Sequence, residues 1–299
     1  MSPKLVKNIE ESTKARLLNY TKKKKGNFNA VLLQFFQERF LARLGESEYK
    51  FHFVLKGGFL LLTQNVNPFR PTVDIDMLGI NLKNDAESLQ SFIQQIACID
   101  LKDSVRFNVD NIQGQVIKED TDYEGLRYTF EAQLGIIKSK MQLDIAFGDD
   151  VPGEFINAQL PTILDDPAFP KILHYPLESV IAEKFQAIVY LGFANSRMKD
   201  FYDILFLAKY NVFDNVKIKK ALDATFSKRK TDIEKRTFIY SRDYISKKRN
   251  LWKAFMRKIN SDSYNDFNDV IARLRMFIEY PITNENDVRK WSPEWWTWK

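Results

Sequence analysis

The stretch "KGGFLLLTQNVNPFRPTVDIDML", residues 56–78, joins a pair of glycines to a pair of carboxylates. Gly57 and Gly58 precede a short apolar run, and Asp74 and Asp76 alternate with apolar residues. In a strand, positions i and i+2 point to the same face, so the two aspartates form a same-side pair. Two like charges that close disfavour each other's ionisation unless a cation compensates them. The stretch therefore predicts a strand that presents two carboxylates to a cation.

A third carboxylate interrupts a later apolar run, "MQLDIAFG", at Asp144. Hard oxygen ligands suit Mg²⁺, with Mn²⁺ as the alternative ion. Three carboxylates on neighbouring strands can hold two such ions about 4 Å apart, an arrangement that serves phosphoryl-type transfer. The predicted metal ligands are therefore Asp74, Asp76 and Asp144.

The glycine pair has a matching explanation. Glycines between a strand and a helix let backbone N–H groups approach a triphosphate, so Gly57 and Gly58 are candidate nucleotide-binding residues. Lys56 and Arg70 flank this region and are further candidates for phosphate contacts. Each motif alone has a simpler explanation, a tight turn for the glycines and a strand-end cap for Asp144. The order of strand, Gly-Gly, helix, loop, Asp-x-Asp and later strand Asp favours the nucleotide site.

Composition narrows the class of protein. The chain has 299 residues, of which 44% are hydrophobic and 28% charged, as in soluble globular proteins. One cysteine, Cys98, excludes an internal disulfide framework, and we expect it to be a core thiol in a reducing compartment. No apolar stretch approaches the roughly 18 residues that a membrane-spanning helix needs, and no signal region is evident. We expect a cytoplasmic, monomeric protein without a membrane partner.

The charge is unevenly distributed along the chain. Residues 217–258 hold 15 Lys and Arg against 4 Asp and Glu, a balance of +11 in a chain of net charge +6. Such a segment is typical of a surface that binds a polyanion, and it is also compatible with a solvated helix face.

Hydrophobic periodicity predicts an α+β fold. We expect a mixed-sheet domain with N-terminal helices over residues 1–160 and a helical domain over residues 161–299. The expected strands span residues 49–57, 72–78, 105–117, 125–135 and 138–148. The expected helices span residues 5–25, 29–44, 58–65, 85–98, 176–192 and 196–210, followed by further basic helices. A Trp-rich tail, "WSPEWWTWK", is expected to pack on its own domain.

The order of these motifs resembles the nucleotidyltransferase superfamily that includes polymerase β. More narrowly, the chain resembles the AbiEii/AbiGii/MenT toxin family of AbiE-type (type IV) toxin–antitoxin systems. The resemblance covers about residues 37–208 and is carried by "FLARLGESEYKFHFVLKGGFLLL", "RPTVDIDML", "LDIAFGDDVP", "YPLESVIAEKFQAI" and "SRMKDFYDI". It implies a polymerase β-like domain followed by a helical domain that contributes Lys and Asp to the cleft.

The resemblance also implies residue roles. Gly57, Gly58, Asp74 and Asp76 fall on the nucleotide- and metal-binding first motif. Lys184 falls on the lysine of the second motif.

Asp200 falls on the acidic position of the following motif. Lys184 could bind a triphosphate as a point charge, and Arg197 could do so bidentately. Asp200 could orient Lys184 or accept a proton. Asp203, three residues later on the same helix face, is an equal candidate for the acidic role. The predicted catalytic residues are thus Asp74, Asp76, Lys184 and Asp200.

The function implied by the resemblance is that of a toxin in abortive infection and phage defence, neutralised by a cognate antitoxin. It would move NMP from an NTP to an acceptor, with tRNA as the expected acceptor since some family members modify its 3′ end. The alternative from another class is an NTP-binding toxin or sensor module that acts by binding a cellular partner without transfer. A glycosyltransferase would also use Asp-x-Asp, but it leaves Lys184 and Asp200 unexplained. The choice of NTP and of acceptor stays open.

Overall fold

The structure is a computed structural model that describes residues 9–24, 26–61, 70, 72–120, 123–149, 151–164, 171–284 and 287–299. The chain divides into two compact units. The first comprises residues 1–148 and 155–174, and the second comprises residues 149–154 and 175–299.

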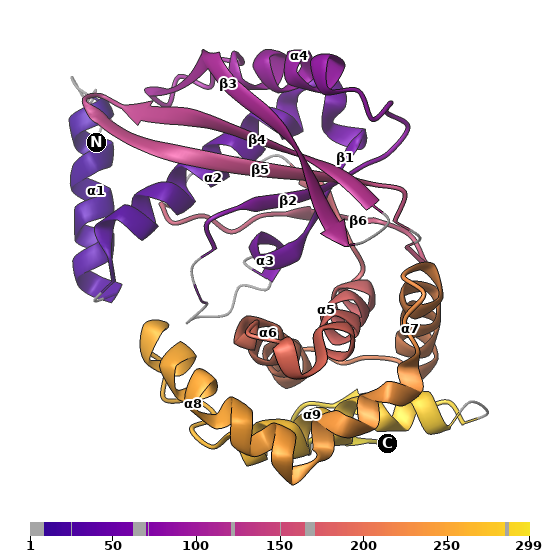
Figure 1. Cartoon of the computed structure of the whole chain (residues 1–299). Helices are drawn as coiled ribbons and strands as arrows, with labels where there is room; N and C mark the ends of the chain where they lie inside the picture. The colour runs from indigo at the N-terminus through magenta and orange to yellow at the C-terminus, as the bar shows by residue number, and fades with distance from the viewer. Residues whose placement is uncertain are drawn as a thin grey trace. The chain divides into compact units, whose positions relative to one another are not determined.

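The first unit is built on a seven-stranded mixed sheet with strand order β3-β4-β5-β2-β1-β7-β6 (Figure 1). Neighbours β1/β7 and β2/β5 run parallel, and the other neighbouring pairs run antiparallel. The mixed sheet confirms the expected α+β class. The strands are β1 (Phe53–Lys56), β2 (Ile75–Gly79), β3 (Val105–Asp120), β4 (Tyr123–Leu134), β5 (Ile137–Phe147), β6 (Ile156–Gln159) and β7 (Lys171–His174).

One face of this sheet carries the hydrophobic core. In β5, Met141, Leu143 and Ile145 alternate with polar positions and are almost fully buried. Helix α2 (Phe28–Glu46) packs against β5, and its Phe40 ring lies 5.8 Å from Phe107 and 5.5 Å from Phe130. Burying one such aromatic side chain stabilises the fold by about 1.5–3 kcal/mol. The residues that alternate with this apolar set must project from the opposite face. The helices of this unit are α1 (Ile9–Lys24), α2 (Phe28–Glu46), α3 (Gly57–Leu60) and α4 (Ala86–Ala97), with η1 (Glu48–Phe51).

Four expectations about local structure need correction. The first expected strand, 49–57, is present only as β1, because Glu48–Phe51 form the 3-10 segment η1. Strands β6 and β7 were not expected, since four residues are too few to show a reliable alternation. The second expected strand begins only at Ile75, so Asp74 lies immediately before it. Cys98 is exposed at the C-cap of α4 rather than buried, because the buried stripe of that helix runs through Leu89, Ile93 and Ile96. The end of the helix expected at 58–65 lies outside the described residues.

The second unit is helical, as expected. Its helices are α5 (Leu177–Leu191), α6 (Met198–Tyr210), α7 (Asn215–Lys228), α8 (Arg242–Lys258) and α9 (Phe267–Thr283), with the 3-10 segments η3 (Gly192–Ala194) and η4 (Ile233–Tyr240). None of the helices in the described part of the chain is long and apolar enough to cross a membrane.

The Trp-rich tail forms a small hairpin of β8 (Trp291–Ser292) and β9 (Thr297–Trp298). Its Trp291 indole N–H donates to the Ala208 carbonyl at 2.6 Å. The Trp298 ring stacks on Phe277 with centroids 5.8 Å apart. The tail therefore packs on its own unit, which confirms the expectation.

Candidate functional site

Four charged side chains lie in register across four adjacent strands of the first unit. Lys56 of β1 pairs with Asp76 of β2, and Asp76 pairs with Asp144 of β5. Asp144 in turn pairs with Arg127 of β4. Directly opposed residues project to the same face of a sheet, so this charged row (Lys56, Asp76, Asp144 and Arg127) lies on the face opposite the core. The row places two carboxylates between two cations.

Asp74 joins the two carboxylates of the charged row. Ligand oxygens of Asp74, Asp76 and Asp144, the acidic triad, lie within 4.8 Å of one another. The Thr72 hydroxyl donates to Asp74 Oδ1 at 2.8 Å and fixes its orientation. Asp144 is buried, and the other two are half-buried. An all-carboxylate donor set of this size fits a hard divalent ion such as Mg²⁺ or Mn²⁺.

The first of the two glycines makes room for the acidic triad, and the second lies against Thr72 and Arg70. Gly57 has φ +67°, and a Cβ at this position would come to 1.8 Å from Asp76 Oδ2. The Gly58 N–H donates to the same oxygen at 3.4 Å, and a Cβ on Gly58 would lie 3.3 Å from Arg70. Gly57 is thus required both by its backbone conformation and by the close approach of the carboxylate. The expected phosphate contacts of Gly57, Gly58, Lys56 and Arg70 stay predictions.

We expect Gly57→Ala to lower nucleotide transfer by at least about a hundredfold, because displacement of a catalytic group by 1 Å can cost that much. The new methyl group would push Asp76 out of place. Transfer to the acceptor, measured alongside thermal unfolding, checks this. Gly153→Ala is the matched control, since Gly153 has φ +96° but its Cβ would meet nothing closer than 3.9 Å. Equal losses in both variants would show that backbone strain alone is responsible.

Arg127 is a residue of the site that no sequence motif marked. Its Nε donates to Asp144 Oδ1 at 2.8 Å, and its Nη2 donates to Oδ2 at 2.7 Å. The Gln142 amide adds a third donor to Asp144, at 3.1 Å. The pKa of Arg127 is raised, mainly by its hydrogen bond to Asp144. Burial opposes this shift, and the charges of Asp144, Asp74 and Asp76 add to it. The guanidinium therefore interacts electrostatically with the whole acidic triad.

The remaining candidate residues form a cluster in the second unit, in which Lys184, Asp200 and Asp203 are buried and Arg197 is exposed. Lys184 Nζ lies 2.6 Å from Asp203 Oδ2 and 3.4 Å from Asp200 Oδ1. Arg197 Nε lies 2.6 Å from Asp200 Oδ2. Both carboxylates are fully buried and contact Lys184, so α6 supplies two acidic partners to this lysine of α5. The catalytic and nucleotide-binding roles of these residues stay predictions.

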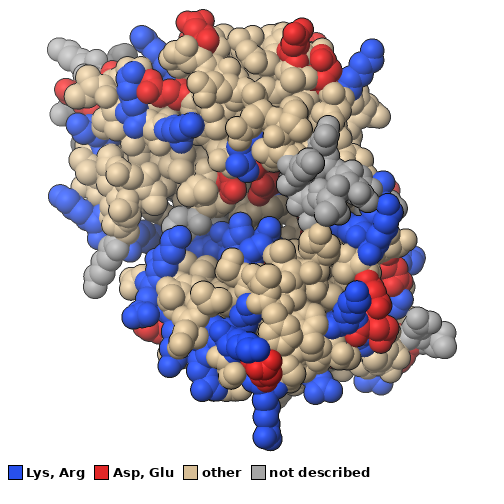
Figure 2. Space-filling model, in the orientation of Figure 1, with Lys and Arg blue, Asp and Glu red and all other residues tan. Residues whose placement is uncertain are grey.

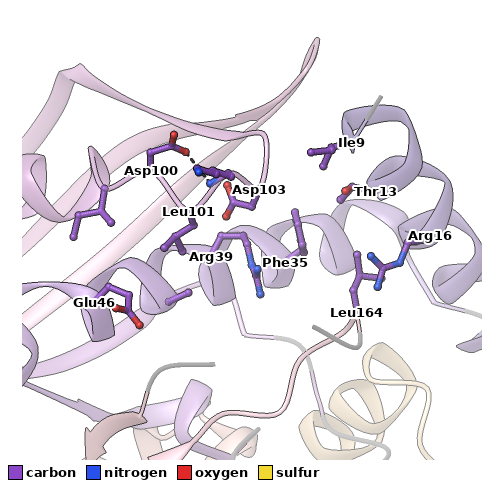
Figure 3. A pocket seen from close by; sticks show the side chains of 13 residues that line it. Ile9, Thr13, Arg16, Phe35, Arg39, Glu46, Asp100, Leu101, Asp103 and Leu164 are labelled. Atoms are coloured by element: carbon purple, nitrogen blue, oxygen red, sulfur yellow. Dashed lines mark hydrogen bonds between the residues drawn. The ribbon is translucent and has the colours of Figure 1, made fainter. Parts of the chain in front are cut away.

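A separate cavity of about 670 Å³ lies beside α1 and α2 (Figure 3). It is lined by Phe35 and Arg39 of α2, Arg16 of α1, and the segment 99–103. Asp103 on its wall is held bidentately by Arg43 at 2.8 and 2.9 Å. No residue of the acidic triad or the charged row lines this cavity, so it is distinct from the candidate site.

The sequence profile of one protein family, described as nucleotidyl transferase AbiEii toxin of a type IV toxin–antitoxin system, matches residues 39–273. The chain belongs to the AbiEii family. The matched region includes the acidic triad, the glycine pair and the Lys184 cluster, and it confirms the resemblance seen in the motifs. Membership in AbiEii makes the chain a nucleotidyl transferase toxin of a type IV system and implies an NTP substrate and an antitoxin partner.

Two solved structures are similar to this AbiEii chain at low identity. One is JHP933 from Helicobacter pylori, with 15% identity, a TM-score of 0.46, and coverage of 86% of this chain and 93% of that one. The other is an H. pylori protein provisionally assigned as a nucleotidyltransferase, with 15% identity, a TM-score of 0.45, and coverage of 86% and 96%. A search of curated proteins gave no match.

Proposed function

We propose that the chain transfers NMP from an NTP to an acceptor hydroxyl on RNA, with tRNA as the expected acceptor, in a reaction that depends on Mg²⁺ or Mn²⁺. The observation that carries this proposal is the acidic triad, whose ligand oxygens lie within 4.8 Å of one another in a chain of a nucleotidyl transferase family. We further propose that the activity is cytoplasmic and serves phage defence.

Two groups of residues in the first unit would have different functions, one in metal binding and the other in phosphate binding. Asp74, Asp76 and Asp144 would hold the divalent ion, which neutralises phosphate charge and lowers the pKa of a coordinated hydroxyl. Lys56, in register with Asp76, and Arg70, beside Gly58, supply positive charge for the triphosphate.

In the transfer step, the acceptor oxygen forms a bond to the α-phosphorus. The bond from that phosphorus to the bridging oxygen breaks, and pyrophosphate leaves with the electron pair. The acceptor hydroxyl loses its proton to a carboxylate of the site or to solvent.

The test is to offer each radiolabelled NTP separately with Mg²⁺ and either total RNA or total protein. We expect label from the α-phosphate, and none from the γ-phosphate, to appear on RNA. NTP binding without any labelled product would favour the sensor module instead. Label on protein would retain the transferase and exclude RNA as the acceptor.

An RNA acceptor is supported by the outer face of α8. This helix buries Tyr244, Lys248, Trp252 and Met256. Figure 2 shows Lys and Arg side chains gathered over this part of the second unit, with few acidic neighbours. Lys248 is an exception, since its Nζ donates to the carbonyls of Phe193 and Asn195 and its pKa is lowered by burial. The exposed cations of α8 are Arg242, Lys247, Arg249, Lys253, Arg257 and Lys258.

Three of these cations provide a test, because Arg249, Lys253 and Arg257 follow one another at i, i+4 and i+8 and share a helix face. Replacing all three with Glu is expected to raise KM for RNA and flatten its salt dependence, since fewer counterions are released on binding. NTP affinity is expected to be unchanged. A control with the same charge change replaces three exposed cations of the first unit, Lys83, Arg106 and Lys140. Identical KM values and salt slopes in the two variants would remove the reason for assigning RNA to α8.

A further inference from the structure

We propose that Arg127 is an internal counter-cation that takes the place of one divalent ion at Asp144 in the nucleotide-free protein. In this state the acidic triad accepts one metal ion, mainly through Asp74 and Asp76. A second ion at Asp144 must first displace the guanidinium. The inference rests on the proposed function of the acidic triad as a metal site, and it makes Arg127 a positioning residue.

The first argument is the occupancy of Asp144. A carboxylate offers about four lone-pair sites. Arg127 occupies one on each oxygen, at 2.8 and 2.7 Å, and Gln142 occupies another at 3.1 Å. About one lone-pair site of the Asp144 carboxylate therefore remains for a metal ion until the Arg127 guanidinium moves away.

The second argument is charge. The three carboxylates of the acidic triad are opposed by Lys56 and Arg127 of the charged row, which leaves one net negative charge. Arg70, buried beside Gly58, brings the sum of these charges to about zero. The first divalent ion therefore already leaves a net positive charge on the group. A second ion would add two more positive charges, which a triphosphate can balance.

The third argument is the difference in burial between the partners. The Asp144 side chain is only 6% exposed, whereas that of Arg127 is 32% exposed. Arg127 can therefore swing into solvent without uncovering the core, and Asp144 cannot follow it. Only the Arg127 side chain has to rotate for a metal ion to replace its guanidinium at Asp144. Assembly of the second metal position then depends on the negative charge that the nucleotide brings.

The experiment is a Mn²⁺ titration of the full chain without nucleotide, followed by electron paramagnetic resonance. We expect one bound ion in the wild type and two in Arg127→Gln. The second ion should bind to Arg127→Gln about ten- to a hundredfold more tightly than to any second site of the wild type. That range is the strength of a charge-assisted contact expressed as affinity. Arg127→Lys keeps the charge but loses the fork, so its second site should be intermediate in affinity.

Two controls locate the new site. Arg106→Gln removes an exposed charge from β3. Arg106 pairs with Gln133 of β4, which lies six residues, about 20 Å along the strand, from Arg127. This variant should behave as the wild type does. Asp144→Asn added to Arg127→Gln should abolish the second site. Thermal unfolding gives an independent readout, because Mn²⁺ should stabilise Arg127→Gln more than the wild type.

Wild-type stoichiometry and affinity in a folded Arg127→Gln protein would overturn the inference and leave the proposed transfer reaction standing. A second site that survives in the Asp144→Asn double variant would also overturn it. If Arg127→Gln does not fold, Arg127→Lys decides, and an unchanged titration there counts against the inference. The absence of Mn²⁺ binding in every variant would overturn both this inference and the metal role of the acidic triad.

Discussion

Asp76→Asn is expected to abolish nucleotide transfer and the growth inhibition that depends on it. Asp76 is the centre of the arrangement, because it pairs in register with both Lys56 and Asp144 and lies against Gly57. The amide keeps the shape of the side chain and can still accept from the Gly58 N–H, but it removes the charge that attracts a divalent ion. Such an ion contributes several kcal/mol to transition-state stabilisation, so we expect transfer to fall by about a thousandfold or more.

The same substitution should leave the protein folded, because the amide keeps the shape of the side chain. Without a metal ion, the neutral amide relieves the repulsion from Asp74 and Asp144 but also removes a counter-charge of the buried Lys56, so we expect only a small net change in the free energy of unfolding. Urea unfolding in chelator measures this, alongside transfer of radiolabelled nucleotide. Asp110→Asn is the matched control, since Asp110 is an exposed aspartate on β3. A folded Asp76→Asn protein with wild-type transfer would exclude the acidic triad from catalysis.

The acidic triad was predictable from the sequence because it depends on order and alternation. Asp74 and Asp76 are two residues apart beside a strand, and Asp144 breaks an otherwise apolar strand. These features are local, and they survive an error of one residue in the limits of β2. Strands β6 and β7 were not predictable, because each has only four residues and is defined by its partner.

The pairing of Arg127 with Asp144 could also have been predicted from the sequence, through the turn that joins their two strands. Strands β4 and β5 are joined by a two-residue turn, Gly135 and Ile136, and Leu134 pairs with Ile137. Gly135 has φ +58° and stands first in the turn, as a type II′ hairpin requires. A two-residue turn fixes the register of the whole hairpin, and counting back from it places Arg127 opposite Asp144. The guanidinium fork itself depends on rotamers, which the sequence does not specify.

Which of Asp200 and Asp203 lies nearer to Lys184 also could not be predicted from the sequence, because it too depends on side-chain rotamers. Spacing puts both on one face of α6, and only the side-chain positions show that Asp203 is the nearer partner of Lys184, at 2.6 Å against 3.4 Å. Lys184 therefore has a structural function in the second unit in addition to any contact with nucleotide.

Replacing Lys184 with Met separates these two functions. The change leaves two fully buried carboxylates with Arg197 as the remaining cation of the cluster. Removing one partner of a buried ion pair costs about 3–5 kcal/mol, and we expect that loss in the free energy of unfolding in urea. Since we also predict that Lys184 contacts the nucleotide, we expect NTP affinity to fall by about one to two decades.

The double variant Lys184→Met with Asp203→Asn decides between the functions. It removes one charge of each sign from the closer pair, so most of the lost stability should return. NTP affinity, measured by calorimetry on the folded protein, should stay low, because no cation has been restored. If the double variant regains both stability and NTP affinity, Lys184 serves only to hold α5 and α6 together. If affinity stays low in a stable protein, the positive charge of Lys184 is needed by the nucleotide itself.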